Sequence, residues 1–117
     1  MKQDISQFVP LSPAAFHILL ALAGDELHGY GIMQEIVQQS AGKYRLGPGT
    51  LYDNLQRLME KGLIEEAARR SGATDPRRRY YRLTALGRRV LSTEVERLEG
   101  MLQEARTHLR ALKPRRT

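Results

Sequence analysis

Five arginines flank one turn-forming segment, and their grouping is the most direct pointer to a chemistry. They are Arg69, Arg70, Arg77, Arg78 and Arg79. Guanidinium groups crowded around one turn repel one another unless an anion lies among them. Basic side chains that neutralise phosphates release condensed counterions, and this release dominates affinity for nucleic acid. The segment therefore predicts contact with a DNA backbone, with a merely solvated loop as the alternative.

A second group of polar side chains lies on a predicted helix from Pro48 to Lys61. At about 100° per residue, its apolar side is formed by Leu51, Leu55, Leu58 and Met59. The opposite side and its flanks carry residue types that hydrogen-bond to base edges in the major groove or to phosphates: Thr50, Tyr52, Asn54 and Arg57. For a lone amphipathic helix a solvated polar face is the ordinary explanation. The DNA-reading interpretation therefore depends on the neighbouring elements.

The chain has few residues that could form a disulfide, a metal site or a catalytic site. The absence of cysteine excludes disulfides, thiolate zinc sites and cysteine nucleophiles. The histidines, His17, His28 and His108, are too widely separated to give metal-ligand spacing. His17 is predicted to be a hydrogen-bonded core residue. We expect no metal, no cofactor and no enzymatic activity, since paired carboxylates and a glycine-rich phosphate loop are also lacking.

The net charge of +6 is concentrated in the middle of the chain. Residues 1–44 carry a net charge of −2, residues 45–89 of +6 and residues 90–117 of +2. A local basic excess is the electrostatic pattern expected for a polyanionic partner. No apolar run reaches the roughly 18–20 residues that span a bilayer, and no signal peptide begins the chain. A cytoplasmic protein without a membrane partner is expected.

The periodicity of the apolar residues and the positions of the glycines and prolines predict the elements that must hold these groups. In order they are helices at 13–24 and 29–41, a short strand at 44–46, the helix at 48–61, strands at 63–69 and 79–84, and a long helix at 85–112. The fold class is mainly α with a small β-hairpin. We expect a winged helix-turn-helix domain at residues 1–84, a dimerisation helix at 85–112 and a disordered basic tail at 113–117.

The last helix carries an apolar seam whose spacing alternates between four and three residues. The seam is formed by Leu91, Val95, Leu98, Leu102, Ala105, Leu109 and Leu112. Three heptads in phase are typical of coiled-coil packing, and a core this small cannot cover so long a seam. We expect a homodimer whose two reading helices enter successive major grooves, about 34 Å apart, on a pseudo-palindromic site of double-stranded DNA.

Several short motifs, in this order and spacing, resemble the PadR-like family of bacterial transcriptional regulators. They are His-Gly-Tyr-Gly-Ile at 28–32, Gly-Thr-Leu-Tyr at 49–52, Gly-Leu-Ile at 62–64 and Arg-Tyr-Tyr-Arg-Leu-Thr at 79–84. The resemblance covers about residues 11–98. It implies a winged helix, dimerisation through a single C-terminal helix as in the compact branch, and repression of transcription.

The resemblance also places specific residues at the DNA. These are Tyr30, Gly49, Thr50 and Tyr52, with a basic wing at Arg77, Arg78 and Arg79. Two departures stand out: Gly47 occupies a position where a serine often caps the reading helix, and the chain lacks the tryptophan that one branch uses to sandwich drugs. Some family members respond to phenolic acids or lipophilic drugs, which raises the hypothesis of a small apolar or aromatic effector.

The sequence thus predicts a DNA-binding repressor acting as a homodimer. The alternative is a winged-helix module that binds a protein, with the arginines meeting an acidic partner. A third interpretation, a small enzyme, finds no support because the sequence offers no catalytic group of residues.

Overall fold

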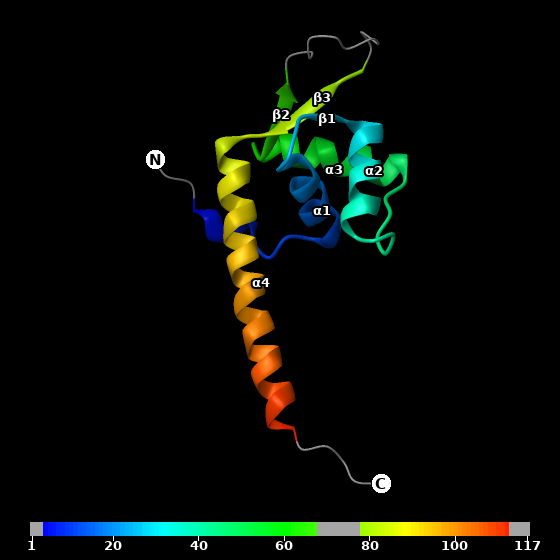
Figure 1. Ribbon diagram of the computed structural model, residues 1–117. Coiled ribbons are helices and arrows are strands. Elements are labelled where there is room, and N and C mark those ends of the chain that lie inside the picture. The colour runs from blue at the N-terminus through cyan, green and yellow to red at the C-terminus, as the bar shows by residue number, and fades with distance from the viewer. Residues whose placement is uncertain (1–3, 68–77, 113–117) are drawn as a thin grey trace.

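The computed structural model describes residues 4–67 and 78–112 and has a helical head from which one long helix projects (Figure 1). The order is η1 (Ile5–Phe8), α1 (Pro13–Leu22), β1 (Leu27–His28), α2 (Gly29–Gln39), α3 (Pro48–Glu60), β2 (Ile64–Ala67), β3 (Tyr80–Leu83) and α4 (Ala85–Ala111). The strands form one antiparallel sheet in the order β1-β3-β2. The predicted sequence of three helices, hairpin and long helix is confirmed.

Local sequence explains where the helices begin. Ser12 accepts a hydrogen bond from the N–H of Ala15 at 3.2 Å, and Pro13 occupies the first helical position of α1. Gly47 precedes α3 without a side-chain cap, as its residue type requires. At the end of α2, Ala41 and Gly42 adopt positive φ angles, and the Gly42 N–H donates to the Val37 carbonyl at 2.8 Å. This left-handed turn ends α2 before the predicted residue 41.

One predicted strand was wrong, and one strand was not predicted. Residues 44–46 form no strand, because Ser40 Oγ hydrogen-bonds both the N–H and the carbonyl of Tyr44 and occupies the groups a ladder would need. The connection before α2 instead contains β1, which pairs Leu27 with Tyr81 and His28 with Tyr80. A third strand therefore joins the predicted hairpin.

The core surrounds α1, which packs against α2, α3, α4 and β3. Its most buried side chains come from every layer: Ile18, Leu19, Ile32, Ile36, Leu51, Leu55, Leu63, Ile64 and Val90. His17 does not behave as predicted, since its Nδ1 is buried without a hydrogen-bond partner. Its ring instead stacks on Tyr44, with a centroid distance of 4.2 Å.

The junction between β3 and α4 is built on Thr84. Its Oγ1 donates to the Gly62 carbonyl at 2.6 Å and accepts from the Gly87 N–H at 2.9 Å. Its backbone N–H donates to the Leu63 carbonyl at 3.1 Å. Gly87 lies against the Leu63 carbonyl group, where a Cβ atom has no room. The start of α4 is thereby fixed to the residues that follow α3.

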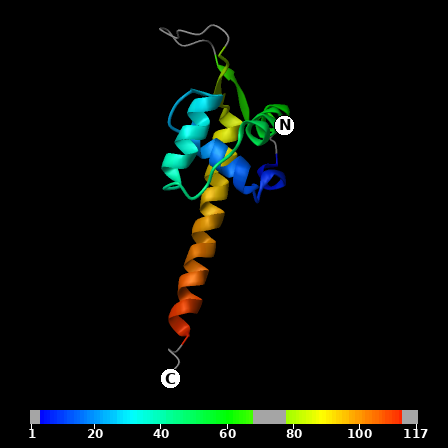
Figure 2. The same cartoon turned by 90° about the vertical axis from the view of Figure 1, so that its right-hand side faces the viewer.

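The two halves of α4 have different environments. The first half packs on the head through Val90, Leu91 and the 2% exposed Glu94, which accepts from the Leu11 N–H at 2.8 Å and from Arg97 Nε at 2.6 Å. The hydrogen bond from Arg97, assisted by Leu11, lowers the pKa of Glu94 despite its burial. The second half extends away from the head in both views (Figures 1 and 2). No helix within the described ranges is long and apolar enough to cross a membrane.

Candidate nucleic-acid interface

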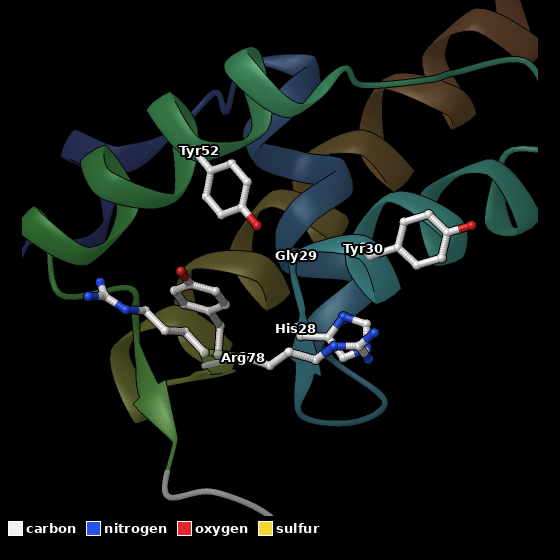
Figure 3. A pocket seen from close by; sticks show the side chains of 7 residues that line it. His28, Gly29, Tyr30, Tyr52 and Arg78 are labelled. Atoms are coloured by element: carbon white, nitrogen blue, oxygen red, sulfur yellow. The ribbon is translucent and has the colours of Figure 1, made fainter. Parts of the chain in front are cut away.

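One face of the head brings together the start of α2, the first half of α3 and the base of the hairpin. A pocket of about 290 Å³ opens there, and Figure 3 shows it from close by. It is lined by His28, Gly29, Tyr30, Tyr52, Arg78, Arg79 and Tyr81. Four of the predicted DNA-contacting residues therefore border one pocket, although they come from three parts of the chain: Tyr30, Tyr52, Arg78 and Arg79.

Tyr52 reaches the pocket because α2 begins with a glycine. A Cβ atom on Gly29 would lie 2.9 Å from Tyr52 Cζ and still closer to the hydroxyl, so only glycine leaves space for the ring as it stands. Burial, followed by the neighbouring Tyr52, raises the pKa of Tyr81. Tyr52 as a whole nevertheless remains 51% exposed.

Tyr30 differs from Tyr52 in its direction. Its ring extends from α2 away from the other side chains of the pocket (Figure 3) and is 60% exposed. An aromatic side chain that is this exposed buries little apolar surface and so contributes little to the stability of the fold. Its place beside the pocket suits a phenol that contacts a partner.

The polar side of α3 divides into two regions. Gly49 and Thr50 are exposed in its first turn, beside Tyr52. Asn54 donates from Nδ2 to the Thr50 carbonyl at 2.9 Å, so it is engaged with its own helix. Asn54 and the exposed Arg57 line a separate hollow of about 240 Å³ against the segment that contains Phe8 and Leu11. The predicted reading residues thus do not form a single cluster.

The hairpin base carries arginines with different partners. Arg82 Nε lies 2.8 Å from Glu65, and Arg82 Nη1 lies 3.6 Å from Glu26. Arg79 Nε lies 3.6 Å from Glu66, in an exposed pair that contributes little to stability. Arg78 faces His28 instead, and within the described part of the chain no carboxylate pairs with it. Arg69, Arg70 and Arg77 lie outside the described residues.

His28 and Gln56 were not among the predicted site residues. His28 caps α2, because its Nδ1 accepts from the Gly31 N–H at 3.1 Å. Burial, and then the charge of Arg78, lower its pKa. The sequence held a signal for this cap, since His28 directly precedes the predicted start of the helix at residue 29. Gln56 is exposed on α3 one turn after Tyr52, and its amide is of the type that reads adenine.

The predicted dimerisation residues follow the seam down α4. Leu91 belongs to the core of its own head, whereas the seam from Val95 onward is exposed. Leu102 is 50% exposed and Leu109 67% exposed. The intervening members, Leu98 and Ala105, are also exposed. Met101 adds an exposed apolar side chain that the seam prediction did not include.

Three helices followed by a β2–β3 hairpin, with the short β1 between α1 and α2 added to its sheet, define a winged helix-turn-helix, a DNA-binding fold. The sequence profile of the transcriptional regulator PadR-like family matches residues 18–93, so the chain belongs to that family of transcriptional regulators. The "Transcriptional regulator Rv3488" of Mycobacterium tuberculosis is 39% identical over 89 residues, which cover 75% of this chain and 78% of the relative.

Solved structures show the same fold. A PadR family transcription regulator from Clostridium difficile has a TM-score of 0.71 and 23% identity, covering 84% of this chain and 99% of that one. Bacillus subtilis PadR, solved in complex with operator DNA, has a TM-score of 0.62 and 24% identity, covering 74% of this chain and 48% of that one.

Proposed function

We propose that the chain is a repressor that binds a pseudo-palindromic operator in double-stranded DNA as a homodimer. The observation that carries the proposal is that Tyr30, Tyr52 and Arg78 border one pocket beside the exposed first turn of α3. Phenolic hydroxyls and guanidinium groups are suited to phosphates, while the adjoining helix presents side chains to base edges. That Bacillus subtilis PadR, which shares the fold, is solved in complex with operator DNA supports DNA binding by this chain.

The homodimer is supported by the exposed apolar seam of α4. A seam with heptad spacing gains stability when it is packed against another helix. A second copy of the same chain offers an identical seam, and a two-fold arrangement of it presents two α3 helices to one DNA.

A release mechanism is supported by a hollow of about 420 Å³ where α4 meets the head. It is lined by Ala23, Leu83, Arg88, Leu91, Ser92 and Val95. An apolar or aromatic effector bound there would lie between the head and the helix that pairs the protomers. A small aromatic acid should then raise the unfolding temperature and weaken DNA binding together; a ligand that does neither is not an effector.

Selection of bound duplexes from a random pool tests the DNA-binding proposal. We expect a two-fold symmetric site whose half-sites are centred about one helical turn apart. Recovery of sequences with no shared motif would contradict sequence-specific binding to an operator. No binding to random DNA at low salt would favour the protein-interaction module instead.

Single substitutions then separate reading from positioning. Thr50→Ala or Arg57→Ala should relax base preference in the selected site, whereas Arg78→Ala should weaken all sequences alike and reduce the salt slope by roughly 0.9. Arg110→Ala, on the far part of α4, is the matched control for loss of one charge. If Arg57→Ala weakens specific and random DNA equally, Arg57 is not a reading residue.

A further inference from the structure

The ring of His28 lies between two hydrogen-bond donors. The Gly31 N–H donates to Nδ1 at 3.1 Å, and Nη1 of Arg78 lies 3.0 Å from Nε2. A neutral imidazole has one N–H and one acceptor nitrogen, and a guanidinium group only donates. His28 therefore cannot accept from both groups at once.

The choice between its tautomers follows from what each donor would lose. The Gly31 N–H belongs to the first turn of α2, where no backbone carbonyl of the helix is available to it. Arg78 is exposed and can hydrogen-bond to water. The tautomer that keeps the cap carries its proton on Nε2. In that state Nε2–H and the Arg78 guanidinium are two donors 3.0 Å apart, and neither is the other's acceptor.

The surroundings of this donor pair are basic and phenolic. The pocket beside it is lined by Arg79, Tyr30, Tyr52 and Tyr81, with no carboxylate among its described lining residues. The edge of the His28 ring also meets Tyr80, at a centroid distance of 5.4 Å. On its other side His28 borders a hollow that contains Glu35 and Arg45. A negatively charged oxygen would supply the missing acceptor.

We propose that His28 Nε2–H and the Arg78 guanidinium together bind one phosphate of the DNA backbone. This proposal rests on the proposed function, because the phosphate belongs to bound DNA. Binding leaves Nδ1 free to cap α2, so the same ring joins the helix to the wing and to the DNA. A phosphate contact carries no base information, so His28 positions the protein without contributing to sequence preference.

His28→Asn tests the contact without removing the cap. An asparagine oxygen caps helices well, and the shorter side chain does not extend to Arg78. We expect an unchanged unfolding temperature and DNA binding about ten- to a hundredfold weaker on selected and random sequences alike, the loss of one hydrogen bond to a charged group. The salt slope stays constant because a neutral ring is removed, whereas Arg78→Ala lowers it by roughly 0.9. His108→Asn, the same change on exposed α4, should leave DNA binding unaltered.

Two further measurements identify the ligand. In the His28→Asn, Arg78→Ala double variant the two losses should be less than multiplicative, because both donors serve one phosphate. Replacing single phosphates of the selected site by uncharged methylphosphonates should reveal one linkage in each half-site that weakens the wild type and not the double variant. Independent losses, or no such linkage, would overturn the proposal.

The wild-type protein supplies a readout that does not depend on folding of a variant. Imidazole nitrogen chemical shifts of His28 in the DNA complex should report the Nε2–H tautomer, and the Nδ1–H tautomer would overturn the proposal. Titration with inorganic phosphate alone should move these shifts weakly at millimolar concentration, whereas DNA moves them strongly. If wild type binds no DNA at low salt, the proposed function fails as well; if it binds and His28→Asn binds equally, only the phosphate site fails.

Discussion

Single residues decide how the pocket is shaped. Tyr52 could be predicted as a DNA contact from its motif, and in the structure it lines the same pocket as Tyr30 and Arg78. The reason it lies there is Gly29, which has no side chain to exclude its ring. That requirement arises between two helices, so neither segment shows it alone. The role of Asn54 was likewise hidden, because a bond to its own helix depends on the rotamer.

Gly29→Ala should displace the Tyr52 ring while leaving the fold intact, because the far end of a side chain can move. We expect DNA affinity to fall by about tenfold, the equivalent of one hydrogen bond, measured by titration of labelled duplex. In a Tyr52→Ala background the same glycine substitution should have no further effect on affinity. An equal loss in both backgrounds would mean that the alanine perturbs α2 itself.

The stability of the protein should fall at acidic pH partly through His28. Its pKa is lowered from 6.5 in the folded chain by burial and by Arg78, so below pH 6.5 the unfolded chain binds protons that the folded chain does not. The contribution is complete above pH 6.5 and is lost as the pH falls toward the folded pKa. His28→Asn should therefore lose less unfolding free energy than wild type between about pH 7.5 and about pH 5.5. Equal losses in urea unfolding would contradict this.

At the scale of elements, α4 is attached to the head through close backbone contact. Thr84 connects the start of α4 to Gly62 and Leu63, which directly follow α3. Gly87 permits this close contact because it has no Cβ atom to collide with the Leu63 carbonyl group. The orientation of α4 is therefore set by the same residues that end α3, and the two helices cannot turn independently.

Two glycine substitutions in α4 should have opposite effects on stability. Gly87→Ala places a Cβ atom against backbone that cannot easily move, and we expect a loss of about 1–3 kcal/mol of unfolding free energy. Gly100→Ala has open space around it and should add about 0.5–1 kcal/mol through helix propensity. Denaturant unfolding of both variants measures the difference. If the two substitutions change the unfolding free energy similarly, the backbone around Gly87 can move to accommodate a Cβ atom.

The elements with strong periodicity were predictable, and the short ones were not. Helices α1 to α4 follow from apolar spacing and from caps such as Ser12 and Thr84. The two residues of β1 carry no period and become a strand only because β3 lies beside them. Tyr44 has a residue type common in strands, yet Ser40 occupies its backbone groups. Both outcomes were decided by a neighbour in space.

At the scale of the whole molecule, the long axis of 63 Å results from the projecting half of α4. Glu94 marks the last buried position of this helix in the described chain, since every described residue from Leu98 onward is exposed. Propensity alone gives marginal stability to an isolated helix of this length. The projecting half therefore depends on a packing partner, for which the second protomer is our proposal.

Leu102→Glu combined with Leu109→Glu should separate the protomers. Charges on the seam would face one another across the pair and lose the apolar contact. We expect sedimentation as a monomer, a lower helical signal in circular dichroism, and much weaker binding to the full site than wild type. Thr107→Glu, on the opposite side of α4 in the heptad, is the matched control and should remain dimeric. A double variant that still sediments as a dimer would place the interface elsewhere.

The projecting half of α4 also has a consequence for how a cell would sense the amount of this protein. If protomers pair as proposed, each tenfold rise in their concentration favours the pair by about 1.4 kcal/mol, and the same rise orders the free end of the helix. Below the pairing threshold each molecule carries one head and holds a single half-site weakly. Occupancy of a two-fold site would then climb more steeply than copy number, giving a threshold in expression rather than a graded response.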